Sequence, residues 1–291
     1  MEFKGYFINL ASKKDRRLSL EKHLKEVNLF NNFERFEAIK PKSNQDLNGL
    51  KTKGEYGVWL SYLTLFEKII EDENNKIFLI IEDDFRFNNA AVSILKNILS
   101  AEEFKSQSIL FLDYLINMQI LEQFLSIENN NKNFYKNGKN FYFSPAAHWY
   151  AACLSCFLID KSNSLYLLKL LRNLFDNLSA ENKLIPVDMA LKKLIGIRAL
   201  NGSILIPPIG APDWDLDKKS SIQTNTNNEI RDAMRAYLLL RLAASGVESP
   251  AFCISKFSKL INKNIFSKPP YKLKDFYEFV LANKNLLNHN W

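Results

Sequence analysis

The chain has 291 residues, enough for one large domain or for one domain with an extension. A hydrophobic content of 47% supports a substantial core, and 24% charged residues together with 22 phenylalanines exclude a largely disordered protein. The net charge of +7 favours acidic partners such as phosphorylated sugars or anionic lipid surfaces, and no recognisable nucleic-acid-binding module accompanies it.

Cysteine use and apolar segments indicate the cellular compartment. Three cysteines are too few for a disulfide framework and suit a reducing cytoplasm. The N-terminus leads directly into a strand-like run without a signal peptide, and no apolar segment is long enough to span a bilayer. We therefore expect a cytoplasmic protein whose contact with the inner face of the cell membrane, where it occurs, is peripheral.

Apolar periodicity predicts strands that alternate with helices. Strands are expected at residues 5–10, 33–39, 78–82, 109–112, 151–159 and 204–207. Helices are expected after Ser12 or Asp15, either of which is a candidate cap, and at residues 57–71, 90–99, 161–175 and 185–196. This alternation predicts an α/β sheet.

The composition changes after about residue 217, where helical patterns cover residues 229–244, 252–262 and 275–282. We therefore divide the chain into a domain at 1–222 and a helical C-terminal extension at 223–291. Basic residues in this extension alternate with apolar ones. They are Lys256, Lys259, Lys263, Lys268, Lys272 and Lys274 among Phe257, Leu260, Ile261 and Phe266. This pattern suits either contact with anionic lipid or a solvated face.

Three consecutive acids, Glu82, Asp83 and Asp84, follow the apolar run 78–81. The run fits a strand covered on both faces, as in a parallel sheet, and open α/β sheets bind ligands at the C-terminal ends of their strands. Mg²⁺ and Mn²⁺ prefer carboxylate oxygens and keep substrate phosphates as further ligands. The acids therefore form either a site for a divalent cation and a diphosphate or a solvated acidic turn.

Cations follow the first predicted strand. Asn9 ends that strand, and Lys13, Lys14, Arg16 and Arg17 crowd the next turn. Positive side chains at a helix N-terminus oppose the helix dipole, so their presence there suggests an anion. They either neutralise a diphosphate or form a solvated helix start.

Two further acids are candidates for catalysis. Asp188 follows Pro186 near a helix start, where it is either a catalytic carboxylate or an N-cap. Asp113 is expected at a strand end, like Asp84. Cys153 and Cys156 form a C-x-x-C pair, but no second pair completes a zinc site, so we interpret both as buried small hydrophobic residues.

Taken in order, these pieces resemble glycosyltransferase family 25, the family of lipooligosaccharide-biosynthesis and collagen-galactosyltransferase-like proteins. Four blocks carry the resemblance. The first is residues 7–10 followed by Asp15-Arg16-Arg17, and the second is residues 34–38. The third is residues 54–57 followed by Leu60-Ser61 and then by residues 80–84, and the fourth is residues 186–188. The resemblance covers roughly residues 5–222, with long unmatched stretches between the blocks. The chain departs from the family at Tyr62, because the family usually has a histidine directly after the serine that corresponds to Ser61.

The resemblance implies a GT-A-like fold, that is, a Rossmann-like mixed sheet flanked by helices. It also implies inverting transfer of galactose or glucose from a UDP-sugar to a glycan or glycolipid acceptor such as lipooligosaccharide. Asp84 would bind the divalent cation, Mn²⁺ or Mg²⁺. Donor-binding residues would be Asn9, Arg16, Arg17, Glu82 and Asp83.

The general base is assigned to Asp188, with Asp113 as the alternative, because inverting transfer needs a carboxylate that accepts the acceptor proton. Two other functions stay open on the sequence. A metal-dependent phosphohydrolase would also place acids at strand ends, and Tyr62 is compatible with a catalytically degenerate protein that still binds a sugar nucleotide.

Overall fold

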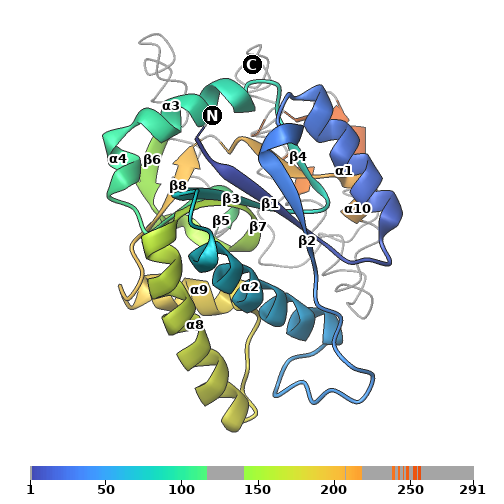
Figure 1. The fold of residues 1–291 in the computed structure, drawn as a ribbon, viewed down its shortest axis with the longest axis vertical. Coiled ribbons are helices and arrows are strands. Elements are labelled where there is room, and N and C mark those ends of the chain that lie inside the picture. Colours follow the sequence, from blue (N-terminus) through green and yellow to red (C-terminus); the bar gives the residue numbers. More distant parts are fainter. Residues whose placement is uncertain are drawn as a thin grey trace.

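The computed structural model describes residues 2–116, 141–206 and 208–217, together with scattered positions between 238 and 256 (Figure 1). Most of the extension predicted at 223–291, including most of its three helices, lies outside these residues. Among the described tail residues, Leu238, Leu239 and Leu242 are buried. The boundary at residue 222 stays a prediction.

A mixed sheet of seven strands forms the centre of the molecule, in the order β2-β1-β3-β7-β5-β8-β6. Its strands are β1 (Lys4–Asn9), β2 (Phe33–Glu37), β3 (Ile77–Glu82), β5 (Ile109–Ile116), β6 (Tyr142–Pro145), β7 (Tyr150–Asp160) and β8 (Gly202–Ile206). Strands β7 and β6 run antiparallel to their neighbours, and the other pairs are parallel. A small second sheet pairs β4 (Phe85–Phe87) with β9 (Gly210–Pro212).

Strand β3 lies inside the sheet, between β1 and β7, and the acids stand at its C-terminal end. Its four inner residues are fully buried, as a strand covered on both faces requires. It pairs with β1 in parallel but with β7 antiparallel, so the predicted burial is confirmed in a mixed rather than a fully parallel sheet.

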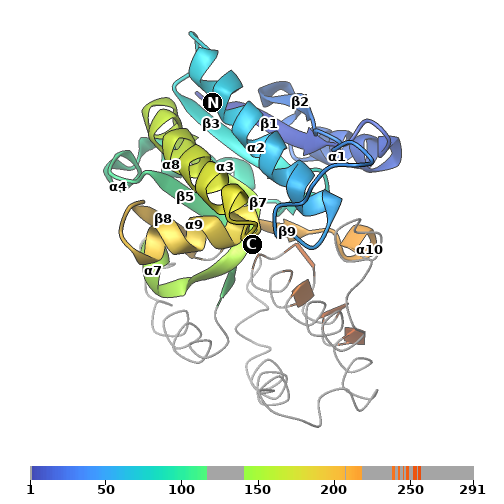
Figure 2. The same cartoon turned by 90° about the horizontal axis from the view of Figure 1, so that it is seen from below.

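Helices cover both faces of the sheet (Figures 1 and 2). One face is covered by α2 (Lys53–Glu71), α8 (Lys161–Ala180) and α9 (Val187–Gly196), and the other by α1 (Lys14–Glu26), α3 (Ala91–Ser100) and α4 (Glu102–Lys105). Short pieces complete the described fold: η1 (Phe30–Asn32), α7 (Ala146–Trp149) and α10 (Trp214–Asp217). The predicted Rossmann-like α/β fold is therefore confirmed.

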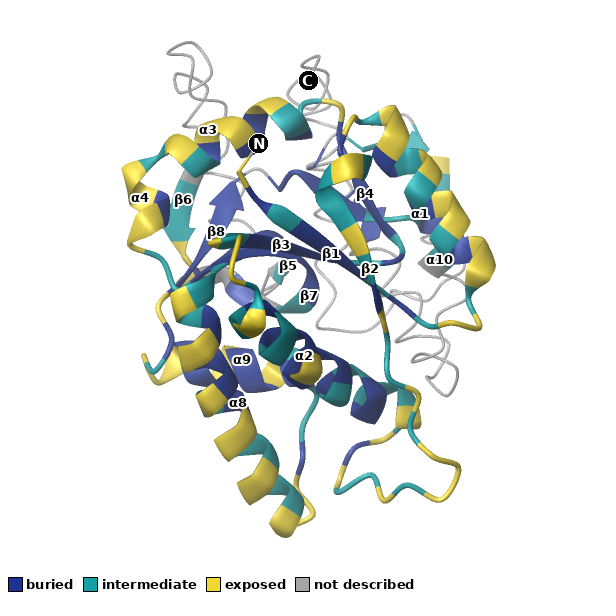
Figure 3. Ribbon diagram, in the orientation of Figure 1, coloured by how far each residue is buried: buried dark blue, intermediate teal, exposed yellow. Residues whose placement is uncertain are grey.

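The sheet separates two apolar clusters, one under each layer of helices. Figure 3 shows the buried residues concentrated in the sheet and on the inner sides of the helices. Alternation along β3 divides its side chains, because Phe78 and Ile80 face α2 whereas Leu79 and Ile81 face the layer of α1 and α3. The same alternation governs the acids that follow.

Two helix starts differ from the predictions. Helix α2 begins at Lys53 rather than Gly57 because Thr52 and Glu55 form a capping box, in which each side chain accepts a hydrogen bond from the other residue's backbone N–H. Helix α1 has Lys13 at its N-cap without a side-chain cap bond, so the caps predicted at Ser12 and Asp15 are wrong.

Candidate functional site

The acid turn, which we define as Asp83 and Asp84, connects β3 to β4. Arg16, from the first turn of α1, places its guanidinium between both carboxylates, 2.7 Å from Asp83 and 2.5 Å from Asp84. Burial alone would lower the pKa of Arg16, but the neighbouring Asp84 and Asp83 outweigh burial and raise it. Arg16, which was predicted to bind an anionic ligand, thus forms ion pairs with two aspartates in this structure.

Asn9 joins the end of β1 to the acid turn. Its amide nitrogen donates to Asp83 Oδ2 at 2.7 Å, and its amide oxygen accepts from Arg35 Nε of β2 at 3.1 Å. Burial raises the pKa of Asp83 to about 6, against the opposing effects of Arg16 and Asn9. The carboxyl ends of β1 and β3 and the Arg35 side chain of β2 therefore form one polar network, as neighbouring parallel strands predict.

Helix α1 contacts β4 beyond the acid turn through residues spaced along one face. Ser19 Oγ accepts from Arg86 at 2.9 Å, and His23 Nε2 accepts from the backbone N–H of Phe87 at 2.9 Å. Arg17 lies off this face and pairs with Glu21 at 3.7 Å. The structure thus brings Arg16 to the acids but directs Arg17 elsewhere.

A later part of the chain also supports the acid turn. The backbone N–H of Asp213 donates to the carbonyl of Asp84 at 2.7 Å, and the Asp213 carboxylate lies 3.2 Å from Arg86 Nε. Asn88, after β4, donates to the carbonyl of Ser245 at 2.7 Å. Sequence reasoning missed these supports because they join segments more than a hundred residues apart.

Glu82 points to the opposite face of the sheet from Asp83, as strand alternation requires. It lies on the side of α2 and α9, within electrostatic range of Asp188 and Tyr62. Burial raises the pKa of Glu82 to about 8, and the charges of Asp84 and Asp83 add to this. The three consecutive acids therefore do not all face one ligand.

The two candidate bases differ in their surroundings. Asp188 is the second residue of α9, where Oδ1 accepts from the backbone N–H of Met189 at 2.8 Å and Oδ2 from that of Cys153 at 3.3 Å. Asp188 is not the N-cap, because Pro186 occupies that position. Asp113 lies within β5 and is fully buried, so its predicted strand-end placement is wrong. Its carboxylate accepts a hydrogen bond from Ser155.

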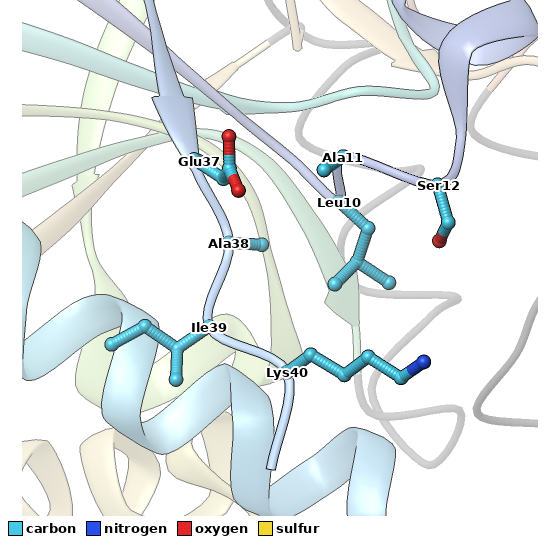
Figure 4. A pocket seen from close by; sticks show the side chains of 7 residues that line it. All are labelled: Leu10, Ala11, Ser12, Glu37, Ala38, Ile39 and Lys40. Atoms are coloured by element: carbon cyan, nitrogen blue, oxygen red, sulfur yellow. The ribbon is translucent and has the colours of Figure 1, made fainter.

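A pocket of about 530 Å³ opens beside the ends of β1 and β2 (Figure 4). One wall is the segment after β1, with Leu10, Ala11 and Ser12, and the other is the last residue of β2, Glu37, with Ala38, Ile39 and Lys40 after it. The first wall begins directly after Asn9, whose side chain holds Asp83. The pocket therefore adjoins the polar network of the acid turn.

Helix α2 fixes the second wall of the pocket. Ser61 Oγ accepts from the backbone N–H of Ile39 at 2.8 Å. A Cβ at Gly57 would lie 2.7 Å from the carbonyl oxygen of Ile39, so only glycine permits this approach of helix to wall. This close approach explains why glycine is needed at the end of block 54–57 of the resemblance.

One oxygen of the acid turn is buried without a partner. Asp84 Oδ1 has no hydrogen bond, although Oδ2 of the same carboxylate binds Arg16. A buried carboxylate oxygen left unsatisfied is costly unless a ligand occupies it. Within the described ranges no group of three or more His, Cys, Asp or Glu side chains is arranged to hold a metal ion. A Mg²⁺ or Mn²⁺ ion shared with substrate phosphates needs only one or two carboxylates.

Comparison with known proteins identifies the family. The model of glycosyltransferase family 25, described as LPS biosynthesis proteins, matches residues 3–191, which is well over half of the chain. The chain belongs to glycosyltransferase family 25. This match contains β1, β3, the acid turn and Asp188, and it confirms the resemblance drawn from the sequence blocks.

A viral relative is similar over a shorter stretch. The protein named "Putative glycosyltransferase R655" of Acanthamoeba polyphaga mimivirus is 29% identical over 120 residues. The aligned part covers 38% of this family 25 chain and 37% of the relative, so the chain spans little more than a third of that relative's length. Separately, among the described residues of this chain, none of the helices has the length and apolar character needed to cross a membrane.

Several residues of the site were not predicted. Arg86 and Asp213 carry no motif and become visible only through their contacts. Arg35 belongs to block 34–38 of the resemblance, but its contact with Asn9 was not predicted. Cys153 is also different from its prediction, because it is partly exposed and has a positive φ of 85°, whereas Cys156 is fully buried as expected. The apolar context of the C-x-x-C pair gave no signal for this difference.

Proposed function

We propose that this family 25 protein is an inverting glycosyltransferase that moves a hexose, galactose or glucose, from a UDP-sugar to a glycan acceptor such as lipooligosaccharide. The observation that carries the proposal is the acid turn, with one buried and unpartnered carboxylate oxygen next to a pocket at the strand ends. The family description as LPS biosynthesis proteins supports a glycan acceptor.

The residues of the acid turn suit a divalent cation, Mn²⁺ or Mg²⁺. Asp84 would hold the ion through the unpartnered Oδ1, and Asp83 lies next to it with both of its oxygens already bonded. When bound, such an ion would act as a Lewis acid that stabilises the negative charge developing on the departing UDP. Arg16, already between the two aspartates, keeps the local charge from becoming strongly negative.

The donor would occupy the pocket between the segments that follow β1 and β2. Ser12 and Glu37 offer a hydroxyl and a carboxylate for ribose or base, and Lys40 offers a cation for phosphate. Asn9 fixes the position of Asp83 relative to this pocket through its 2.7 Å hydrogen bond. Binding in a fixed orientation lowers the entropic part of the barrier.

Asp188 would act as the general base. It lies on the face of the sheet that α2, α8 and α9 cover, and the acceptor would approach it there. In the transfer step, the acceptor hydroxyl oxygen forms a bond to the anomeric carbon of the hexose, and the hydroxyl proton passes to the Asp188 carboxylate. The bond between that carbon and the UDP oxygen breaks, and its electron pair leaves with UDP. Attack from the face opposite the diphosphate inverts the configuration.

A donor screen tests the proposal. Thermal shift and calorimetry with a panel of UDP-sugars, with and without Mn²⁺, should show Mn²⁺-dependent stabilisation by UDP-galactose or UDP-glucose. UDP release should then depend on a glycan acceptor. Asp84→Asn should abolish Mn²⁺-dependent UDP binding and reduce turnover about a thousandfold. The control Asp176→Asn, on the exposed side of α8, should change neither.

Other outcomes would select the alternative functions. Binding of UDP and Mn²⁺ without transfer to any acceptor in the panel would indicate a degenerate binding protein. Release of phosphate from model phosphate esters would indicate a phosphohydrolase. An Asp84→Asn variant with wild-type turnover would exclude Asp84 as a required ligand.

A further inference from the structure

Strand β7 contains a bulge at Cys153–Ser155, opposite the part of β5 that carries Asp113. The pairing places Asp113 opposite Cys156 and Leu115 opposite Ala152, so β7 has extra residues between these two pairs. Cys153 has a φ of 85°, a left-handed conformation that residues with a Cβ rarely adopt. Such a conformation persists only where its surroundings enforce it.

Two buried tyrosine hydroxyls bind the backbone of this bulge. Tyr150 donates to the carbonyl of Cys153 at 2.7 Å, and Tyr62 of α2 donates to the carbonyl of Leu154 at 2.8 Å. Both rings are fixed by aromatic neighbours, because Tyr150 stacks on Phe111 with centroids 4.2 Å apart and Tyr62 packs against Phe157. The two carbonyls are therefore held by groups that have little freedom to move.

The consequence of the bulge is the direction of one N–H group. With Cys153 in the left-handed conformation, its backbone N–H donates to Asp188 Oδ2 at 3.3 Å. The thiol of the same residue lies 3.3 Å from Ser155 Oγ, whose hydroxyl donates to Asp113. Asp113 thus supports the far side of the bulge rather than facing the acceptor, since it is fully buried.

We propose that Tyr62 and Tyr150 are positioning residues that hold the Cys153–Ser155 bulge so that its N–H orients the Asp188 carboxylate toward the acceptor hydroxyl. This inference rests on the proposed role of Asp188 as general base. It gives Tyr62, the position at which the chain departs from the family's usual histidine, a function through the backbone rather than through contact with substrate.

Other titratable groups face Asp188 from the surrounding elements. Glu82 faces it from β3, Tyr62 from α2, and Tyr150 and Cys153 from β7. On α9 itself the nearest cations, Lys192 and Lys193, are exposed, and α7 contributes the exposed His148. Tyr62→Phe and Tyr150→Phe remove only neutral hydroxyls, because burial raises the pKa of both tyrosines well above its usual value, and the other groups stay in place. A shift in pH dependence therefore reports the N–H contact.

The test compares three hydroxyl deletions in the full-length protein. Tyr62→Phe and Tyr150→Phe should each lower kcat, and the double variant should lower it about 10- to 100-fold with an unchanged KM for the UDP-sugar. The acid limb of the pH–rate profile should move to higher pH, because a carboxylate that loses an N–H donor is protonated more easily. The control Tyr114→Phe removes an equally buried hydroxyl that donates to the Leu205 carbonyl and should leave the acid limb in place.

A rescue experiment separates positioning from general loss of structure. Cys153→Gly keeps the N–H and adopts a positive φ without strain, so it should restore part of kcat and of the pH profile in the double variant. Unaltered kcat and acid limb in the tyrosine variants would overturn the inference while transfer by the wild type still supports the proposed function. A wild type that transfers no hexose would instead overturn the proposed function.

Discussion

At the scale of single residues, the charge balance of the acid turn depends on one guanidinium. Arg16 lies within 2.7 Å of both aspartates, whereas the adjacent Arg17 forms only a partly exposed pair with Glu21 at 3.7 Å. Two neighbouring residues of the same type therefore have very different electrostatic roles. This contrast provides a matched pair of variants.

Arg16→Gln should lower the free energy of unfolding by about 3 kcal/mol, because it leaves two adjacent, largely buried carboxylates without their cation. Arg17→Gln should lower it by about 0.5 kcal/mol or less, as for other solvated pairs. Urea denaturation at pH 7.5 without added metal measures both. Equal losses in the two variants would show that the acid turn does not depend on Arg16.

His23 should make stability depend on pH. Burial lowers the pKa of His23 to about 4, and the charge of the nearby Arg86 adds a smaller effect in the same direction. The neutral ring accepts a hydrogen bond from the backbone N–H of Phe87. The unfolded chain binds this proton near pH 6.5, so the stabilisation is complete above pH 6.5 and is lost as the pH falls toward 4.

The wild type should therefore lose on the order of 2 kcal/mol more stability between pH 7 and pH 4.5 than His23→Gln does. Denaturant unfolding at a series of pH values provides the comparison. Parallel curves for the two proteins would contradict a buried neutral histidine.

At the scale of elements, the pocket wall after β2 depends on its fit against α2. Gly57→Ala should displace Ile39, whose carbonyl oxygen would lie 2.7 Å from the new Cβ, and should weaken UDP binding about tenfold or more. Gly196→Ala, at the end of α9, meets nothing within 4 Å and should be neutral or stabilising by about 0.5 kcal/mol. Calorimetry with UDP measures the first effect and thermal unfolding the second. UDP affinity that is equal in both variants would refute the pocket assignment.

Elements with strong apolar periodicity could be predicted from the sequence. The strand before the acids and helix α2 follow directly from their patterns, and the fold class follows from the alternation of such segments. Strands β4 and β9 could not be predicted, because three-residue strands carry too little periodicity. The interior position of Asp113 was also hidden, because a polar residue after an apolar run usually marks a strand end.

The candidate site was only partly predictable for a related reason. Sequence order places Asp83 and Asp84 at the end of β3 and Asn9 at the end of β1, and parallel pairing then brings them together. Strand alternation predicts that Glu82 and Asp83 point to opposite sides, but it also predicts Asp84 on the side of Glu82, whereas in the structure Asp84 lies with Asp83 on Arg16. The bulge at Cys153 depends on hydroxyls from two distant elements, so no local pattern reveals it.

At the scale of the whole molecule, the basic extension remains the predicted contact with anionic lipid. Of its lysines, the described Lys256 lies over the ring of Phe252 at 5.1 Å. Full-length protein should sediment with vesicles that contain anionic lipid, and less so as salt increases. Lys263→Glu with Lys268→Glu should reduce the bound fraction several-fold, whereas Lys192→Glu with Lys193→Glu on α9 should not. Binding that is insensitive to the first pair would refute the lipid contact.

The family match ends at residue 191, yet the acid turn is tied to residues that come later in the chain. Asp213 binds the backbone of Asp84, and Ser245 accepts from Asn88 just after β4. The part of the protein that the family model matches is therefore not a transplantable module. A chimera that joins residues 1–191 to the C-terminal part of another family member would also replace the scaffold that fixes the carboxylate proposed to bind the cation.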